Sequence, residues 1–307
     1  MKGERDFILT IIPTNNRAGL LPQAIESVIA QGYPSKKIII INDGSTDETE
    51  NVCNEYVHRY AGIVSHQYKE NGGCASARNC GLDLIGEDIG YVCFLDDDDR
   101  LLPSKFSREV ELLEKNSEAD FSYADSIIHD EETGLEKLQK VAGAGRPEDF
   151  AIEHFLTNEA KSAALLYRVG VVKGRRFRED LRYNEDSEFL QRIAIECKGI
   201  YSTEPGCWVR WHTGSKSRNL IEINEAILQS GLGIINAYPS FYDFYKDLID
   251  SRIKKIQNEL FVELLLAGRM DEARKYQTNR WKKYFISQLC VYYMLKVSFR
   301  ALVSFNK

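Results

Sequence analysis

The chain has 307 residues, 43% of them hydrophobic and 28% charged, which is typical of a folded globular protein and excludes disordered and fibrous classes. The formal net charge of -6 argues against a nucleic-acid-binding protein, because that class needs a basic face to neutralise phosphates. The seven cysteines include no Cys-x-x-Cys pair, and residues 1–6 lack the apolar core of a signal peptide. We therefore expect a reduced, cytoplasmic protein that does not bind nucleic acid.

The first hundred residues alternate between short apolar runs and amphipathic helical stretches, which is the pattern of parallel strands joined by helices. Residues 7–12 form the first apolar run, which we expect to end before Pro13. Residues 37–41 are apolar throughout, as expected of a central strand covered on both faces. The remaining predicted elements are strands at 63–68 and 90–95 and helices at 20–31, 49–60 and 74–85. The sequence thus predicts an α/β fold on a largely parallel sheet.

Beyond residue 100 the pattern loosens. A helix is predicted at 104–115, and strand-like runs occur at 121–129 and 162–168. We interpret residues 101–217 as the second half of the domain that begins the chain. Residues 218–307 are strand-poor and predict a C-terminal helical region.

Residues 284–295 are apolar and aromatic with basic residues on both sides, but the run is shorter than the roughly 20 residues that cross a bilayer. A helix of this kind can lie on the inner face of the plasma membrane as a peripheral contact. It can equally pack on its own domain or on a second subunit, and periodicity does not separate these hypotheses. The oligomeric state stays open.

Four consecutive aspartates, from Asp96 to Asp99, follow the predicted strand at 90–95. Their carboxylates repel one another, and a bound cation would offset this cost. Oxygen ligands without soft ligands nearby suit Mg²⁺ or Mn²⁺, which usually bind through one or two carboxylates plus the phosphates of a substrate. A substrate with a diphosphate is the matching partner, and an exposed acidic turn is the alternative.

Polar residues also follow the other predicted strands, at 14–17 and 43–47. Because the carboxyl ends of parallel strands lie on one rim of a sheet, these clusters and the acidic run should converge. Asp43, in a tight Asn-Asp-Gly turn, can accept hydrogen bonds from a base or a ribose. Residues 45–48 can also be explained as the cap of the next helix.

Gly72 and Gly73 allow close backbone approach before a helix whose N-terminus favours negative charge. Arg78 lies one to two turns into that helix, within reach of a nucleotide. A flexible loop followed by a surface arginine is the alternative.

Glu185 and Asp186 come just before an amphipathic helix, whose dipole stabilises carboxylates, so that capping of the helix is one explanation for them. A base that deprotonates a sugar hydroxyl would need such a carboxylate. His212 can complete a metal or phosphate site, although a single histidine is more often structural.

Taken in order, these segments resemble the family 2 inverting glycosyltransferases with the GT-A fold, over about residues 7–217. The resemblance implies a Rossmann-like, mostly parallel sheet flanked by helices, with residues 1–100 as the nucleotide-binding half and 101–217 as the acceptor-binding half. It implies Asp186 as the catalytic base beside Glu185. The implied metal ligands for Mn²⁺ or Mg²⁺ are Asp98, Asp96 and His212. The implied nucleotide-sugar site comprises Pro13, Thr14, Asn15, Arg17, Asp43, Arg78, Asp96 and Asp97.

Three residues depart from the family pattern. Asn15 stands where relatives often have a tyrosine, and Asn42 where many have a first aspartate. Asp97 replaces the usual small residue within D-x-D. The last departure bears on which aspartates ligate the metal.

The resemblance implies metal-dependent, hexosyltransferase-type transfer from a nucleotide-diphosphate sugar, expected to be a UDP-sugar, to a hydroxyl of an acceptor glycan or lipid-linked glycan. Cell-surface polysaccharide or lipid-linked glycan synthesis is the expected setting. A polyprenyl-phosphate acceptor is an alternative, but a phosphate needs no base such as Asp186. A processive synthase should carry membrane helices, and no apolar run here reaches the length of a span. A nucleotidyltransferase should carry a glycine-rich, lysine-bearing loop, which the segment after the first predicted strand is not. A non-catalytic nucleotide-sugar-binding protein is the alternative from another class.

Overall fold

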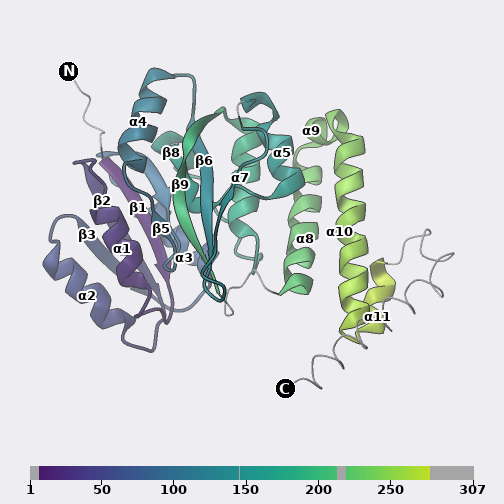
Figure 1. Cartoon of the computed structure of the whole chain (residues 1–307), viewed down its shortest axis with the longest axis horizontal. Helices are drawn as coiled ribbons and strands as arrows, with labels where there is room; N and C mark the ends of the chain where they lie inside the picture. The colour runs from purple at the N-terminus through teal and green to yellow at the C-terminus, as the bar shows by residue number, and fades with distance from the viewer. Residues whose placement is uncertain (1–6, 145, 213–218, 277–307) are drawn as a thin grey trace.

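A computed structural model describes residues 7–144, 146–212 and 219–276 (Figure 1). The first four long strands run parallel to one another. They are β1 (Phe7–Thr14), β2 (Lys36–Asp43), β3 (Val64–Lys69) and β4 (Ile89–Phe94). Their order across the sheet is β3-β2-β1-β4. The carboxyl ends of these strands therefore lie along one edge, as the sequence predicts.

The sheet continues beyond β4 with strands of both directions. They are β5 (Arg100–Leu101), β6 (Phe121–Asp130), β7 (Glu136–Gln139), β8 (Leu165–Arg168) and β9 (Gly199–Trp211). The order continues β8-β6-β9-β5, and β7 pairs with β6 outside this row. β8 is antiparallel to both β4 and β6, whereas β9 is parallel to β6. The parallel part of the sheet is thus the half that the first hundred residues build.

Helices cover both faces of the sheet (Figure 1). One face carries α1 (Leu21–Ile29), α2 (Thr49–Arg59) and α4 (Lys105–Lys115). The other carries α3 (Cys74–Asp83), α5 (Phe150–Thr157), α6 (Val169–Val172) and α7 (Glu185–Glu196). Successive residues of β2 alternate between the two cores: Ile38 packs in the first and Ile39 in the second. This double burial explains why β2 is apolar throughout.

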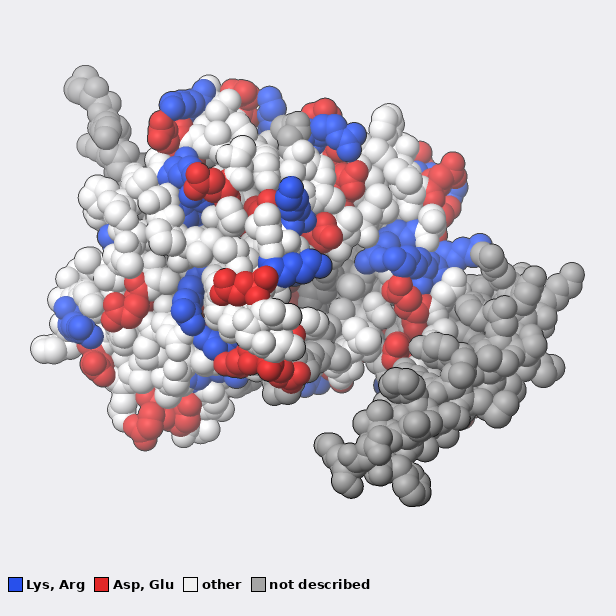
Figure 2. Space-filling model, viewed as in Figure 1, with Lys and Arg blue, Asp and Glu red and all other residues white. Residues whose placement is uncertain are grey.

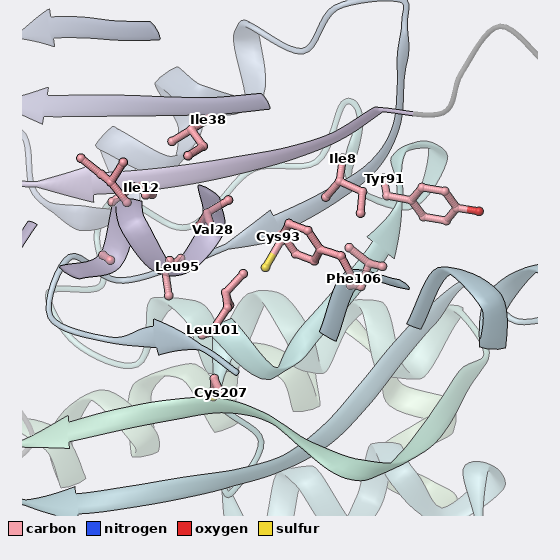
Figure 3. Packing of buried hydrophobic residues seen from close by; sticks show 14 of the residues in the cluster. Ile8, Ile12, Val28, Ile38, Tyr91, Cys93, Leu95, Leu101, Phe106 and Cys207 are labelled. Atoms are coloured by element: carbon pink, nitrogen blue, oxygen red, sulfur yellow. The ribbon is translucent and has the colours of Figure 1, made fainter. Parts of the chain in front are cut away.

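The core beneath α1 and α4 is seen from close by in Figure 3. Ile8 of β1 and Cys93 of β4 lie on the same side of the sheet as Val28 of α1 and Phe106 of α4. All four side chains are 0% exposed. Burial of this apolar surface fixes the register of β1 against β4, because a slip by one residue would turn these side chains to the opposite face.

The C-terminal helices are α8 (Leu220–Ala237), α9 (Pro239–Phe244), α10 (Lys246–Leu266) and α11 (Met270–Ala273). α8 packs on α7, and α10 packs on α8 and α5. α8, α10 and α11 share a core of their own that includes Leu228, Leu260 and Ala273. In the described part of the chain, no helix combines the length and the apolar character that a membrane span requires. Residues 284–295 lie outside that part, and the domain boundary at 217 stays a prediction.

Three predicted boundaries are wrong. β1 does not end before Pro13 but continues to Thr14. The pairing of β1 with β4 ends at Ile11, so the nitrogen of Pro13, which faces β4, has no ladder hydrogen bond to lose. Ser162–Ala164 forms a turn of 3₁₀-helix before β8. Glu185 and Asp186 lie in the first turn of α7 rather than before it.

A histidine is buried between α5 and α7. His154 is 2% exposed, and its Nε2 lies 3.0 Å from the hydroxyl of Ser187 and 3.2 Å from the carbonyl oxygen of the same residue. Burial lowers the pKa of His154 to about 4, against the opposing effects of the Ser187 carbonyl and of Asp186, while Lys161 lowers it further. His154 is therefore neutral in the folded protein at neutral pH, whereas it titrates at about 6.5 in the unfolded chain.

Acidification from pH 7 to pH 5 should lower the free energy of unfolding by about 2 kcal/mol through His154. Because the folded pKa lies below the unfolded one, the unfolded chain takes up the proton first. The stabilisation is complete above about pH 6.5 and is lost as the pH falls towards the folded value. Urea unfolding of the wild type and His154→Gln at both pH values measures this contribution. The same pH dependence in both proteins would contradict it.

Candidate functional site

Gly81 lets α3 pack closely on β1. A Cβ atom at this position would lie 2.4 Å from Cγ2 of Ile11, so that no larger residue fits without moving the helix. Arg78 lies one turn earlier on α3 and is 1% exposed. The close approach of α3 therefore brings a buried guanidinium to the carboxyl edge of the parallel strands.

The guanidinium of Arg78 joins two predicted motifs that are far apart in the sequence. Its Nη1 donates to Oε1 of Glu185 at 2.8 Å, and its Nη2 donates to Oδ1 of Asp96 at 2.6 Å. Its Cζ lies 5.4 Å from the ring centroid of Phe177. Burial on its own would lower the pKa of Arg78, but neighbouring negative groups, including Asp96 and Glu185, raise it well above its usual value. The side chain stays charged and holds the end of β4 to the start of α7.

Asp186 follows Glu185 in the first turn of α7 and is half-buried. Within the described ranges, its carboxylate has no hydrogen-bond or ion-pair partner. Burial raises the pKa of the neighbouring Glu185, which Arg78 lowers and Asp186 raises further. The two acidic residues thus differ in their surroundings: Glu185 is bound to Arg78, whereas Asp186 is half-buried without such a partner among the described residues.

The carboxylate of Asp43 orders the turn before α3. It accepts hydrogen bonds from Nζ of Lys69 at 2.6 Å and from the backbone nitrogens of Gly72 and Gly73 at 2.9 and 2.8 Å. A carboxylate offers about four acceptor positions, so one position on Asp43 remains for a ligand. The structure therefore brings the predicted Asp43 and glycine motifs into direct contact.

The segment after β1 lies against the same turn. Pro13 and Thr14 end the strand, and the amide of Asn15 donates to the carbonyl oxygen of Asp43 at 2.7 Å. Asn16 adopts a left-handed conformation with a φ of 55°, and its Oδ1 accepts a hydrogen bond of 2.7 Å from the backbone of residue 46. The ends of β1 and β2 thus form one connected rim.

The carboxyl groups of the acidic run, Asp96 to Asp99, are buried to different extents. Burial raises the pKa of Asp97 to about 7, Asp98 adds to the rise, and Arg17, whose Nε lies 3.8 Å from Oδ1 of Asp97, lowers it. Burial also raises the pKa of Asp98 and of Asp99, and Asp99 accepts a hydrogen bond of 3.0 Å from the backbone nitrogen of Arg210. A bound cation would reverse these shifts, because it favours the charged carboxylates.

His212 and Asp98 are the nearest pair of candidate metal ligands, with 3.4 Å between Nε2 and Oδ2. One oxygen of Asp96 is instead bound to Arg78. Across residues 7–144, 146–212 and 219–276, no three histidine, cysteine or acidic side chains form a group that could hold a metal ion. The carboxylate fits a Mg²⁺ or Mn²⁺ ion that takes its other ligands from substrate phosphates, whereas the imidazole is a ligand of transition metals rather than of Mg²⁺.

Of two residues that order this rim, Lys69 was missed by the sequence-based prediction, and Asn16 was predicted only as part of the polar cluster at 14–17. Lys69 is the last residue of β3 and binds Asp43, and its place at a strand end could have indicated it. Asn16 follows β1, and asparagine is one of the few residues that adopt the left-handed conformation readily. Lys69 binds the carboxylate of Asp43, and Asn16 accepts a hydrogen bond from the backbone of residue 46. Both residues order the rim, and a search for chemically reactive side chains does not detect such a role.

Basic and acidic side chains are interspersed over the described part of the face seen in Figure 2. Many of the basic residues are paired locally, as Arg210 is with Glu131 at 2.7 Å and Arg192 with Glu188 at 2.9 Å. A phosphorylated ligand would therefore depend on individually placed groups rather than on a broad positive field.

Parallel strands with an acidic turn and a helix N-terminus at their carboxyl edge define an α/β protein, a class in which ligands generally bind at that edge. The profile of the glycosyl transferase family 2 matches residues 10–180, which is more than half of the chain. The chain belongs to this family.

A minor teichoic acid biosynthesis protein of Bacillus subtilis, GgaB, is 30% identical over 193 residues, which is 61% of this chain and 21% of that protein. The chain spans about a third or less of the length of the first curated relatives that it matches. Among solved structures, S. aureus TarS 1–349 in complex with UDP-GlcNAc superposes with a TM-score of 0.58 at 18% identity, covering 83% of this chain and 72% of that one.

The mannosyltransferase PcManGT of Pyrobaculum calidifontis, in complex with GDP-Man and Mn²⁺, superposes with a TM-score of 0.61 at 15% identity, covering 94% of this chain and 80% of that one. At these identities the likeness concerns the fold. The predicted GT-A fold with helices at its C-terminal side is confirmed.

Arg78→Met should lower the free energy of unfolding by about 3 kcal/mol, because it leaves Glu185 as a buried carboxylate without its cation. Arg176→Met is the matched control. Arg176 pairs with Asp83, both side chains are at least half exposed, and we expect a loss below about 1 kcal/mol. Urea unfolding at neutral pH measures both losses, and equal losses would show that the buried pair has no special weight.

Proposed function

We propose that this protein is an inverting, metal-dependent glycosyltransferase of the hexosyltransferase type. It transfers a sugar from a nucleotide-diphosphate sugar to a hydroxyl of an acceptor glycan. The observation that carries the proposal is the carboxylate of Asp186. This carboxylate has no hydrogen-bond or ion-pair partner among the described residues. The neighbouring Glu185 is bound to Arg78, and Arg78 is also bound to Asp96 in the acidic turn after β4.

The nucleotide would lie along the rim formed by residues 13–17 and Asp43. The remaining acceptor position of Asp43 suits an N–H of the base or a ribose hydroxyl. Arg17 and Asp97, which lie beside each other at this rim, would complete the pocket. Arg78 would support the nucleotide indirectly, because both of its terminal nitrogens donate to protein carboxylates.

Asp98 would hold a Mn²⁺ or Mg²⁺ ion, with His212 as a further ligand for Mn²⁺, and Asp96 retains one oxygen that is not bound to Arg78. When bound, the ion would neutralise charge that develops on the departing diphosphate. The raised pKa values of Asp97 and Asp98 support a cation here, since Arg17 and His212 offset the burial of these carboxyl groups only in part.

Asp186 would accept the proton of the acceptor hydroxyl as its oxygen attacks the anomeric carbon. The bond from that carbon to the nucleoside diphosphate breaks in the same step, and the configuration inverts. Glu185 would orient the first turn of α7 through its bond to Arg78. An acceptor phosphate would need no such base, which favours a hydroxyl acceptor over a polyprenyl phosphate.

UDP is the nucleotide that we propose, and a cell-surface polysaccharide or lipid-linked glycan is the proposed acceptor. TarS was solved with UDP-GlcNAc and the Pyrobaculum mannosyltransferase with GDP-Man, so that the two fold neighbours differ in the base. The relative named for minor teichoic acid biosynthesis supports a surface glycan. We propose that the enzyme acts in the cytoplasm.

The release of nucleoside diphosphate from UDP-, GDP- and dTDP-sugars, with Mn²⁺ or with EDTA, tests the donor and the metal together. We expect slow hydrolysis of a UDP-sugar that needs Mn²⁺ and is lost in Asp98→Ala, because Asp98 would hold the ion. Turnover of a GDP- or dTDP-sugar alone would correct the base. No binding or hydrolysis of any donor would favour a non-catalytic protein and refute the proposal.

Asp186→Asn should lower kcat for transfer about 10²- to 10⁴-fold, because the amide cannot accept the proton, while the KM for the donor changes little. Asp83→Asn is the control, since Asp83 is an exposed carboxylate on α3 that pairs with Arg176. Steady-state kinetics with a saturating acceptor separate kcat from KM. An Asp186→Asn enzyme with wild-type kcat would remove Asp186 from the role of base.

A further inference from the structure

Side chains of α8 hydrogen-bond to the segment that leads into α7. The amide nitrogen of Asn184 donates to the hydroxyl of Ser230 at 2.8 Å, and that hydroxyl donates to the carbonyl oxygen of Ile227 at 3.1 Å. Ser230 is 4% exposed. Its neighbour Gln229 lies 3.4 Å from the carboxylate of Asp180. Helix α8 is thus tied to the chain directly before Glu185 and Asp186.

Asn184 is the N-cap of α7 and directly precedes Glu185. Its φ of 63° lies in the left-handed region, which asparagine adopts more readily than most residues. Its Oδ1 accepts a hydrogen bond of 2.8 Å from the amide of Asn158, which ends α5 and is also left-handed, with a φ of 57°. Both sides of the Asn184 amide are therefore bound, which fixes the direction in which α7 starts.

The same chain of hydrogen bonds continues to the other side of the acidic pair. The hydroxyl of Ser187 donates to Oδ1 of Asn158 and lies 3.0 Å from Nε2 of His154. Ser187 directly follows Asp186 in the first turn of α7. The residues immediately before and after Glu185 and Asp186 are consequently both members of one polar chain.

We propose that α8 positions the catalytic base through this polar chain, which consists of Ser230, Asn184, Asn158, Ser187 and His154. The inference rests on the proposed role of Asp186. Arg78 holds Glu185 from the side of the sheet, and the polar chain holds the flanking residues from the side of α5 and α8. These are positioning residues, because they act on Asp186 through the backbone of α7. The C-terminal helices would then belong to the catalytic unit as well as to any membrane or subunit contact.

Ser230→Ala and Asn184→Gly test the proposal. Alanine suits a helix but removes the hydroxyl, and glycine keeps the positive φ but removes both amide hydrogen bonds. We expect kcat for transfer to fall about 10- to 100-fold in each variant, because a small displacement of a catalytic group carries a cost of this order. The KM for the donor should stay at the wild-type value, since the nucleotide rim is untouched.

Hydrogen exchange followed by mass spectrometry gives a second readout that needs no activity. Amides of residues 184–190 should exchange faster in both variants, whereas β1 and β4 should keep their protection. Leu232→Ala is the matched control, because Leu232 lies on α8 but is 45% exposed and outside the polar chain. It should match the wild type in kcat and in exchange.

Wild-type kcat and exchange in both variants would overturn the proposal. Faster exchange spread equally over β1, β4 and α7 would also overturn it, since that result means general destabilisation. If the wild type transfers no sugar, the proposed function fails, and exchange at residues 184–190 still decides whether α8 fixes the start of α7. A lower kcat together with faster exchange confined to residues 184–190 would support the proposal that α8 positions Asp186.

Discussion

The buried guanidinium of Arg78 is the interaction on which the site depends. Taking a cation out of water is costly, and the cost is offset only when its partners are close and well oriented. Here the partners are Asp96, at the end of β4, and Glu185, at the start of α7, and the ring of Phe177 lies beneath the cation. One side chain therefore links the acidic turn to the helix that carries Asp186. Removing it would leave a buried carboxylate unpaired and would also release the helix.

The polar groups around Arg78 differ in how well their charges are balanced within the protein. The carboxylate of Asp43 is bound by Lys69 and two backbone nitrogens, so the rim proposed for the nucleotide is ordered by the protein itself. The acidic turn differs, because burial raises the pKa of Asp97 and Asp98 in the absence of a cation. The rim at Asp43 is ordered, whereas the acidic turn carries an electrostatic cost. This combination favours a ligand that brings a metal ion with its phosphates.

The parallel half of the fold could be predicted because burial on both faces of β2 leaves a direct mark in the sequence. The acidic run was equally visible, since four adjacent carboxylates are costly wherever they lie. β9 was not predicted, because its 13 residues include glutamate, proline and glycine and are buried irregularly, so that they show no clear period of two. The pairing of Arg78 with Glu185 joins residues 107 positions apart, and no local pattern records such a contact.

The contact of α8 with α7 is likewise a tertiary contact that no local sequence pattern records. It bears on how the chain is divided into domains. A boundary near residue 217 follows from composition, because strands give way to helices there. The hydrogen bond from Asn184 to Ser230 crosses that boundary and ends beside the acidic pair. Apolar packing alone would tolerate small shifts of α7, whereas a buried polar chain loses hydrogen bonds as soon as it moves. A polar chain at this place therefore suits a helix whose first turn must hold one carboxylate in a fixed position.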